Sequence, residues 1–507
     1  MMKFEGARMG TYTASSKVWL TSSLQDNTDY LLNEFADCSD AVFRDLTFAD
    51  NLQGVLVYFD GIVKTEELNN SVLQPLLLHY RELSSEQPDV KDMEERLITL
   101  SETSRVRTLE DLVDRVLEGN AVLLLDGFNE ALVLHVAGAT RRSVQEPQSE
   151  AVVRGPREGF VESIQTNVAL VRLRIRSSKL KMVQYVIGEE TKTTVMLAYM
   201  EGIAKPDVID EVKRRLASIK IDGILESGYI EELIEDNPYS PFPQLRHSER
   251  PDTVASQLLE GKFAIFTEGT PFVLKGPTNL WQMIQANEDY YERYLIGTLL
   301  RILRYFLMTV ALLLPSLYIA TTTFHQDMLP TTLLQSIAAA REAIPFPALI
   351  EALIMEIAFE ALREAGVRLP KTVGQAVSIL GALVIGQAAV QAGIVSAPMV
   401  MIVSMTGIAS FTIPHFNFAI SVRMLRFPLM FLAGILGLFG IVAGIYLIGL
   451  HLVMLRSFGQ PYLTGFAPYR KHESKDMVVR VPWWRMKLRP STSQRSNKQR
   501  QEPDYQG

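Results

Sequence analysis

The sequence is almost free of cysteine and lacks the short motifs on which many enzymes depend. Cys38 is the only cysteine among 507 residues, so no disulfide within the chain is possible. The opening stretch MMKFEGARMGTYTASSKVWL has no apolar core, so we expect no cleavable signal peptide. No Gly-x-x-x-x-Gly-Lys-Ser/Thr loop, Gly-x-Gly-x-x-Gly turn or Gly-x-Ser-x-Gly elbow is present. These absences exclude the commonest nucleotide-binding and serine-hydrolase patterns.

Metal ligands are also sparse. The seven histidines are scattered, and none stands at ligand spacing from the cysteine or from another histidine. The sequence therefore predicts no metal site and no cofactor, and together with the missing motifs it gives no basis for an enzyme. The net charge of −7 is spread over the whole chain, and no nucleic-acid partner is predicted.

What the sequence has in quantity is long apolar segments, all in its second half. Four of them are about as long as the hydrocarbon core of a bilayer is thick, or close to it. They are LLRILRYFLMTVALLLPSLYIA, VGQAVSILGALVIGQAAVQAGIV, PMVMIVSMTGIASFTIP and FPLMFLAGILGLFGIVAGIYLIGLHLVML. The sequence before them reads as an ordinary soluble protein. A soluble head on a polytopic membrane domain indicates a receptor, a channel or a transporter.

The head contains two copies of one pattern, offset by about 141 residues. Asp60-Gly61 follows an apolar strand in the first copy, and Glu201-Gly202 does so in the second. Leu117-Glu118-Gly119 and Leu259-Glu260-Gly261 each close a helix, with glycine just past its end. A hairpin follows in both copies, AVLLLDGFNEALVL and FAIFTEGTPFVL. We therefore expect a fold of two tandem, repeated α/β subdomains in the soluble head, followed by an α-helical polytopic membrane domain.

The domain boundaries follow from these features. We predict an N-terminal tail (1–24), α/β subdomain 1 (25–140), a linker (141–163), α/β subdomain 2 (164–290), a transmembrane domain (291–457) and a basic C-terminal tail (458–507). The linker is rich in Arg, Glu, Gly and Pro, which is typical of an exposed connection. It is either a simple connector or a subunit contact, and the residues leave both open.

One stretch of the second copy is ambiguous. Residues 171–176 alternate apolar residues with arginine, which is typical of a strand. They align, however, with residues 27–32, which read as a capped helix. We predict a helix, with Asn167 able to cap it and with Arg172, Arg174 and Arg176 near its surface. A solvated polar face is favoured over a docking patch for an acidic partner.

The segment FPALIEALIMEIAFEALREAG, between the apolar runs, carries four carboxylates: Glu351, Glu356, Glu360 and Glu364. The last three recur every four residues, so they share one face of a helix. Carboxylates at bilayer depth are costly and usually mark a function or a water-filled path. The alternative is an interfacial or re-entrant helix with its acids in water. We favour this alternative, which leaves four full crossings.

The apolar helix predicted around residue 379 has two faces. One is a stripe of small residues suited to close helix packing. Gln387 and Gln391 lie nearly opposite, and amides are unfavourable against lipid, so we expect them to face protein or a pore. In the last apolar run, Gly440 and Gly444 form a small-xxx-small motif, which indicates helix association within or between subunits. The candidate pore residues are Glu351, Glu356, Glu360, Gln387 and Gln391.

Basic residues at both ends of the membrane domain predict its orientation. Arg293, Arg301 and Arg304 flank the start of the first apolar run, and the tail after residue 457 is strongly basic. The positive-inside rule keeps both ends in the cytoplasm, which requires an even number of crossings. The head and the tail are therefore both expected on the cytoplasmic side.

Several unusual stretches resemble one protein family. They are QEPQSEAVVRGPREGFVE, AYMEGIA, FPQ followed by Arg250-Pro251-Asp252, LLEGKFAI, EALREAGVRLP and GALVIGQAAV. In this order, and over nearly the whole chain after about residue 25, they resemble the A subunits of GerA-type spore germination receptors. A SpoVAF-like paralogue, a spore membrane protein of similar layout, shares the resemblance.

The resemblance implies a multi-pass protein of the inner membrane of bacterial spores. It implies partners, namely a transporter-like B subunit that recognises the germinant and a lipoprotein C subunit. It also implies a homo-oligomer that forms an ion channel and releases monovalent cations. The resemblance transfers no individual pore residues. Two alternatives stay open: a membrane-anchored signalling scaffold, whose helices only anchor it, and a SpoVAF-like accessory spore ion channel. A secondary transporter is less favoured, because no inverted repeat with broken helices stands out.

Overall fold

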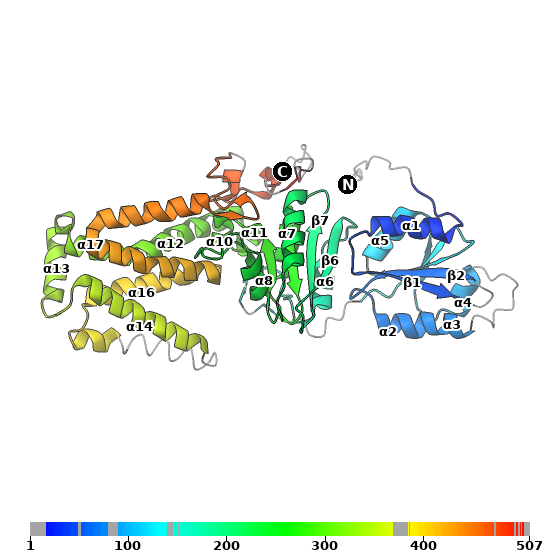
Figure 1. The fold of residues 1–507 in the computed structure, drawn as a ribbon, viewed down its shortest axis with the longest axis horizontal. Coiled ribbons are helices and arrows are strands. Elements are labelled where there is room, and N and C mark those ends of the chain that lie inside the picture. The colour runs from blue at the N-terminus through cyan, green and yellow to red at the C-terminus, as the bar shows by residue number, and fades with distance from the viewer. Residues whose placement is uncertain are drawn as a thin grey trace, which may run out of the picture.

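The computed structural model places two α/β domains beside a bundle of long helices (Figure 1). It describes residues 17–48, 52–79, 90–138, 146–147, 149–150, 152–368, 384, 386–470, 473–490, 493–494, 497 and 499–500. Most of the predicted helix around residue 379 lies outside the described residues.

The first domain is a sheet between two layers of helices. Its described strands, β1 (Ala41–Thr47), β2 (Gln53–Phe59), β3 (Thr103–Val106), β4 (Ala121–Leu125) and β5 (Ala131–Leu134), pair antiparallel in the order β1-β2-β4-β5-β3. The helices α1 (Leu24–Glu34) and α5 (Leu109–Leu117) lie on one face in Figure 1, and α2 (Thr65–Leu68), a π-helical turn (Asn69–Leu73), α3 (Gln74–His79) and α4 (Val90–Arg96) lie on the other. Strand β4 is buried along its whole length, which explains its unbroken apolar run AVLLL.

The second domain has the same layout. Its described strands, β6 (Leu180–Ile187), β7 (Thr193–Met200), β8 (Arg246–Ser248), β9 (Phe263–Thr267) and β10 (Val273–Gly276), pair in the order β6-β7-β9-β10-β8. The helices α6 (Ile164–Arg172) and α9 (Pro251–Leu258) pack into the core on one face of the sheet. The helices α7 (Pro206–Ser218) and α8 (Ser227–Ile234) pack on the other. The predicted glycines after α5 and α9 are confirmed, with positive φ at Gly119 and Gly261.

Buried asparagines make the same contact in both domains. Asn27 accepts a hydrogen bond from the Thr21 backbone N–H at 3.0 Å and donates to the Thr21 carbonyl at 2.7 Å. Asn167 accepts from the Val161 N–H at 2.8 Å and donates to its carbonyl at 2.6 Å. The prediction that Asn167 caps α6 is therefore wrong, because the cap is Ser163 and Asn167 ties the helix to the preceding extended segment.

The turn between the two strands of each hairpin also makes a matching contact. The Asp126 carboxylate accepts from the Leu24 N–H at 3.2 Å, and the Glu268 carboxylate accepts from the Ile164 N–H at 3.1 Å. Both bonds satisfy an N–H in the first turn of a helix, where no intrahelical partner exists. In each domain the hairpin therefore holds the start of the first helix.

Arg172 corrects another prediction. The helix α6 ends at Arg172 rather than continuing to residue 176, and the Arg172 side chain is buried instead of lying at the surface. It reaches into the first domain and pairs in bidentate fashion with Asp40, with N–O distances of 2.9 and 2.8 Å. Arg174 is half-buried beside Glu158, and only Arg176 is exposed as predicted. The alternation reflected a helix end whose last arginine turns inward.

The domains are also joined through backbone groups. The Ser39 N–H donates to the Met182 carbonyl at 2.7 Å, and the Met182 N–H donates to the Asp37 carbonyl at 2.8 Å. These bonds pair residues 37–39 with the outer edge of β6, an edge that would otherwise be open. The ion pair and the covered edge together fix the two sheets relative to each other.

The bundle begins directly after two short helices, α10 (Leu280–Ile284) and α11 (Glu288–Tyr291). Its described helices are α12 (Tyr294–Thr323), α13 (Thr331–Arg341), α14 (Ala348–Arg368), α16 (Ala397–Phe411) and α17 (Phe416–Met454), with a 3-10 turn at Gln326–Met328. Among the described residues, α12 and α17 are the helices long and apolar enough to cross a membrane, while α16 is apolar but shorter. Apolar side chains of α12, α14, α16 and α17 form one core.

The last apolar run is a hairpin rather than the single helix predicted. Gly437 has φ 62° and ψ −141°, which breaks α17 into arms of residues 416–436 and 438–454. A Cβ on Gly440 would lie 2.1 Å from the Leu432 carbonyl oxygen, and one on Gly444 would lie 2.4 Å from Leu429. The small-xxx-small motif therefore serves packing within the subunit, where glycine lets the two arms approach closely.

The C-terminal tail returns to the second domain (Figure 1). It contains the strands β11 (Arg456–Ser457) and β12 (Gln460–Pro461) and 3-10 turns at Glu473–Asp476 and Trp483–Arg485. Ser493 forms an isolated bridge with Ala204, and the Gln494 N–H donates to the Ile203 carbonyl at 2.7 Å. The tail thus lies against the same domain that precedes the bundle.

Candidate functional site

The carboxylates of α14 become steadily more exposed along the helix. The side chain of Glu356 is 0% exposed, that of Glu360 is 30% exposed and that of Glu364 is 65% exposed. Among the described residues, Glu364 pairs only with Arg368, one turn further along the same helix. The face predicted from the four-residue spacing therefore runs from the interior of the bundle to its surface.

Glu351 belongs to a separate, fully buried contact. Its Oε1 pairs with Arg341 of α13 at 3.0 Å. Its Oε2 accepts hydrogen bonds from the Ser396 backbone N–H at 2.9 Å and from the Ser396 hydroxyl at 2.7 Å. Ser396 is the residue before α16, so the carboxylate satisfies an N–H at the start of that helix and complements its dipole. Glu351 thereby ties α13, α14 and α16 together.

Glu356 and Glu360 meet three arginines inside the bundle. Glu356 pairs with Arg426 of α17, and both side chains are buried. Glu360 lies between Arg363 of its own helix and Arg423 of α17, 3.5 Å from each. The described cluster thus holds two carboxylates and three guanidinium groups.

The hydrogen-bonding capacity of this cluster is not filled. The Arg426 Nε donates to the Ala311 carbonyl at 2.9 Å, but its second terminal nitrogen has no partner among the described residues. The Oε1 atoms of Glu356 and Glu360, and the Nε of Arg363, also lack hydrogen-bond partners within the described part of the chain. Buried charged groups normally have their hydrogen bonds satisfied, so this incompletely paired cluster is the candidate site within the bundle.

The two glutamines lie apart from this interior. Gln387 and Gln391 are both exposed on the surface of the bundle. Much of the segment before them, residues 369–383 and 385, lies outside the described residues. Their spacing of four residues puts them on one helix face, so the two side-chain amides lie side by side on the outer surface of the bundle.

Sequence reasoning missed the arginines of this site. Arg423 and Arg426 stand three residues apart in SVRMLRFP, directly before the first residues of the last apolar run, FPLMF. In the structure α17 starts earlier, at Phe416, and draws both into the bundle. Their spacing on one helix face was the available signal.

A second polar network lies at the base of α12. Asp289 pairs with Arg301 at 3.3 Å and with Arg304 at 2.7 Å, and Arg301 also pairs with Asp476 of the tail at 2.9 Å. Two of the arginines predicted to anchor the first apolar run are therefore held by carboxylates: Arg301 by Asp289 and Asp476, and Arg304 by Asp289. The start of α12 is fastened to both the head and the tail.

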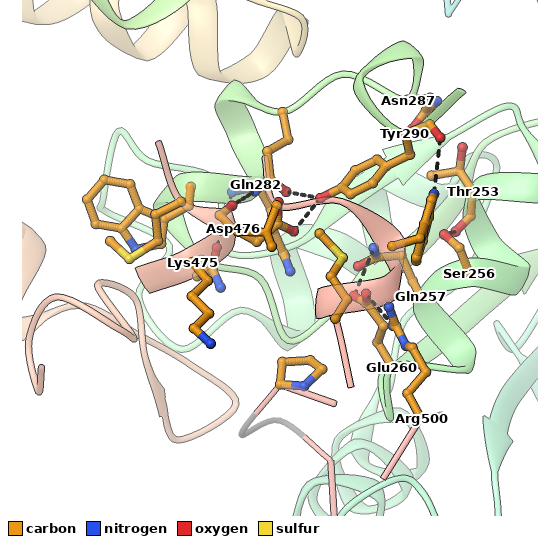
Figure 2. A pocket seen from close by; sticks show the side chains of 18 of the residues that line it. Thr253, Ser256, Gln257, Glu260, Gln282, Asn287, Tyr290, Lys475, Asp476 and Arg500 are labelled. Carbon is orange, nitrogen blue, oxygen red and sulfur yellow. Dashed lines mark hydrogen bonds and ion pairs between the residues drawn. The ribbon is translucent and has the colours of Figure 1, made fainter. Parts of the chain in front are cut away.

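Tyr290 completes this network. Its hydroxyl donates to Asp476 at 2.7 Å, a contact drawn in Figure 2. Burial, followed by the nearby Asp476 charge, raises the pKa of Tyr290 well above 10.0, so the phenol stays protonated and remains a donor. The pocket in Figure 2 lies beside this contact, between α9, the α10–α11 segment and the tail.

Two of the residues that suggested a family have structural roles. The buried Gln244 side chain accepts a hydrogen bond from the Asn237 backbone N–H and donates one to the Asn237 carbonyl. The Gln244 backbone carbonyl accepts from the Ser457 hydroxyl of the tail at 2.7 Å. Arg250 is buried, pairs with Asp252 at 2.9 Å and donates to the Pro156 carbonyl of the linker at 2.8 Å. These motifs hold the linker and the tail on the second domain.

Comparison with known proteins extends over nearly the whole chain. Residues 29–492 match the family model described as Bacillus/Clostridium GerA spore germination protein. The chain is 56% identical over 481 residues to the uncharacterized membrane protein YfkQ of Bacillus subtilis, covering 95% of this chain and 93% of that protein. It is 45% identical over 489 residues to spore germination protein KA of Bacillus subtilis, covering 96% and 90% respectively.

A solved structure also matches part of the chain. It is the crystal structure of the N-terminal domain of the A subunit of the Bacillus megaterium spore germinant receptor GerK3. The two chains are 34% identical, the match covers 52% of this chain and 98% of the GerK3 chain, and the TM-score is 0.42. The family model and the two full-length relatives decide the assignment. The chain belongs to the GerA family of Bacillus and Clostridium spore germination proteins.

Proposed function

We propose that this protein is the A subunit of a germinant receptor in the inner membrane of bacterial spores and that its copies assemble into a cation channel. Family membership supports the role in germination. A receptor of this kind works with a transporter-like B subunit and a lipoprotein C subunit, and we propose both as partners.

We also propose that the two α/β domains are tandem copies of one unit. Their strand orders correspond, and the asparagine and hairpin contacts recur at a nearly constant offset. A duplicated unit explains why a chain without a solenoid period carries the same landmarks twice.

The head and the tail are proposed to lie on the same, cytoplasmic side. The bridge between Ser493 and Ala204 supports this, because segments in contact cannot be on opposite sides of a bilayer. The two arms of α17 count as two passes, so with α12, α16 and the run at 373–395 the number is odd unless α14 also crosses. We therefore propose that α14 crosses too, in place of the interfacial helix and the four crossings that the sequence alone favoured. Its 21 residues span about 32 Å, enough for a bilayer core.

The incompletely paired charges inside the bundle are the observation that carries the channel proposal. A helix bundle that served only as an anchor would need no ionisable groups at this depth, where each one is costly. The Glu356–Arg426 pair and the shared Glu360 instead resemble the polar interior of a protein that handles ions. This observation favours a channel over a membrane-anchored scaffold.

We propose Glu360, Gln387 and Gln391 as residues that line the ion path. Glu360 is the partly accessible carboxylate of the cluster, and the glutamines are exposed where lipid would not solvate an amide. A second copy of the chain packed on that face would cover them. Glu351 and Glu356, both fully buried, are proposed to act on the path through the positions of their arginine partners.

Single-channel recording of the purified full-length protein in planar bilayers tests the proposal. The wild type should conduct monovalent cations, and Glu360→Gln should lower the conductance or the preference for cations over anions. Glu364→Gln is the matched control, because this residue lies on the same helix face but pairs with Arg368 at the surface. Absence of conductance from correctly assembled protein would contradict the channel and favour the scaffold.

A further inference from the structure

Three basic side chains converge on one face of the second sheet. Arg246 of β8 stands directly opposite Lys275 of β10, and Lys275 stands opposite Ala264 of β9. Lys262 comes two residues before Ala264, so strand alternation puts it on the same face. Their exposed fractions are 7%, 2% and 1% for Arg246, Lys275 and Lys262, so all three cations are buried in the protein.

These cations lack the partners that buried charges need. The Lys275 Nζ and the Arg246 Nε have no hydrogen-bond partner within the described residues. The Lys262 Nζ donates to the side-chain carbonyl of Gln282, and the Arg246 guanidinium donates to the Gln282 backbone carbonyl at 3.2 Å. Neutral carbonyl groups do not balance three positive charges, and an unpaired buried charge is strongly unfavourable.

Carboxylates nearby are too few or already engaged. Glu150 is close enough to favour the charged forms of Arg246 and Lys275, and it accepts a hydrogen bond from Ser248. The other acid within electrostatic reach of Lys275, Asp252, pairs with Arg250. Glu260, the acid within electrostatic reach of Lys262, pairs with Arg500. With all three basic groups protonated, the one remaining carboxylate leaves an excess of two positive charges.

The cations are not required by the fold itself. The positions 142 residues earlier in the first domain are Ser104, Asn120 and Val133, and Ser104 stands opposite Val133 as Arg246 stands opposite Lys275. The same sheet therefore forms with uncharged residues at these places. The positive cluster is a special feature of the second domain.

A pocket opens next to the cluster, between α9, the α10–α11 segment and the tail. It has a volume of about 210 Å³, room for a ligand of several heavy atoms. Arg246 and Thr253 line it, and the buried Thr253 hydroxyl has no hydrogen-bond partner among the described residues. Thr253, Gln282 and Tyr290 surround the space in Figure 2. Its inner wall thus offers unused donors.

We propose that this pocket binds a small divalent oxyanion, a phosphate or a short dicarboxylate. The Arg246 guanidinium and the Thr253 hydroxyl would contact the oxyanion, and Lys262 and Lys275 would stabilise its charge from within the sheet. Two negative charges match the excess of two positive ones. Burial lowers the pKa of Lys262 to about 7 and that of Lys275 well below 10.5, a cost that a bound anion would offset. The site goes beyond the proposed channel, and its occupancy does not depend on conduction.

Binding is tested on the full-length protein in detergent by calorimetric titration and thermal melting. Sodium phosphate and sodium succinate are compared with sodium chloride at equal ionic strength. We expect saturable binding of one of the two anions, or of both, and a rise in Tm on the order of 5 °C at a hundred-fold excess over Kd. The relative affinities of phosphate and succinate decide which of the two anions fits the pocket better.

Two variants make the test specific. Lys275→Met removes an unpaired buried charge at similar volume, so it should raise Tm without an anion and weaken anion binding about ten-fold or more. Arg246→Gln, which lines the pocket, should weaken binding at least as much. Lys220→Met, an exposed lysine of the same domain, is the matched control and should change neither.

The proposal is overturned if phosphate and succinate act on the wild type no differently from chloride. It is also overturned if a folded variant, either Lys275→Met or Arg246→Gln, binds the anion as tightly as the wild type does. Failure of binding would leave the conductance measured for the Glu360 variants untouched. The two proposals therefore fail separately.

Discussion

The buried ion pair between the two α/β domains should contribute strongly to stability. Replacing Arg172 by methionine keeps most of the apolar stem but removes the guanidinium. Asp40 then loses both charge-assisted hydrogen bonds, of 2.9 and 2.8 Å. The variant also loses the bond to the Leu180 carbonyl at 2.9 Å and the contact of the guanidinium with the Phe59 ring, 4.4 Å away.

The expected loss follows from burial. The side chains of Arg172 and Asp40 are 1% and 5% exposed, so water cannot replace the missing partner. Removing one partner of such a pair costs about 3–5 kcal/mol, because the other charge stays buried and uncompensated. For a domain of this size, that corresponds to a fall in the Tm of the head by roughly 6 to 20 °C.

The assay is thermal melting of the full-length protein with limited proteolysis at the domain junction. Arg174→Met is the matched control, since this neighbouring arginine is partly exposed and pairs with Glu158 near the surface. It should cost less than about 1 kcal/mol. The double variant Arg172→Met with Asp40→Asn should recover much of the loss, because it no longer buries a lone charge.

Two results would refute this reasoning. The first is that Arg172→Met melts no earlier than Arg174→Met, which would mean that the pair is solvated or broken in solution. Alternatively, the double variant could lose as much as both single variants added together, which would mean that Asp40 and Arg172 stabilise the head independently.

Three further predictions concern topology, the α17 hairpin and pH. In a cysteine-free background, a cysteine placed at Val479 should react with a membrane-impermeant label only from the cytoplasmic side. A cysteine placed at Met328 should react only from the opposite side of the membrane. Labelling of both positions from one side would contradict the proposed orientation. Gly437→Ala should lower stability by about 1–3 kcal/mol, seen as a lower Tm, because its φ of 62° is strained for alanine, whereas Gly449→Ala, with open space around it, should not. Burial lowers the pKa of Lys262 from 10.5 to about 7. Between pH 7 and pH 10.5 the unfolded chain therefore holds the Lys262 proton more tightly than the folded protein does, so the stability of the folded protein should rise with pH in this range. Without an added anion, Lys262→Met should therefore melt at a higher temperature than the wild type near pH 7, and the gap should narrow towards pH 10; a constant gap would show that Lys262 does not titrate in this range.

Local features of the head were readable from its sequence because they depend on neighbouring residues. The glycines after α5 and α9 adopt the positive φ that the Leu-Glu-Gly pattern predicts. The helix α7 begins at Pro206, and proline is favoured at the first position of a helix. Such signals need only a few residues of context.

Features that depend on distant partners were not readable. Arg172 looked like a surface residue because its partner, Asp40, lies 132 residues away in another domain. The Glu356–Arg426 pair joins residues 70 apart, and neither stretch alone identifies the other. Gly437 stands in a run with several other glycines, all at spacings typical of helix packing, and only its backbone conformation distinguishes the turn.

Buried ion pairs recur at each junction of this protein, and this has a mechanical consequence. Asp40–Arg172 joins the two domains, Asp289–Arg301 fastens the base of α12 to α11, and Glu356–Arg426 joins α14 to α17. A displacement at any of these junctions must separate a pair that water cannot reach, so intermediate positions are unfavourable. Segments held in this way are expected to exchange between discrete arrangements, in which each charge has a partner, rather than to drift continuously. The proposed receptor subunit, which would stay closed until a signal arrives, would use such junctions to hold one discrete arrangement.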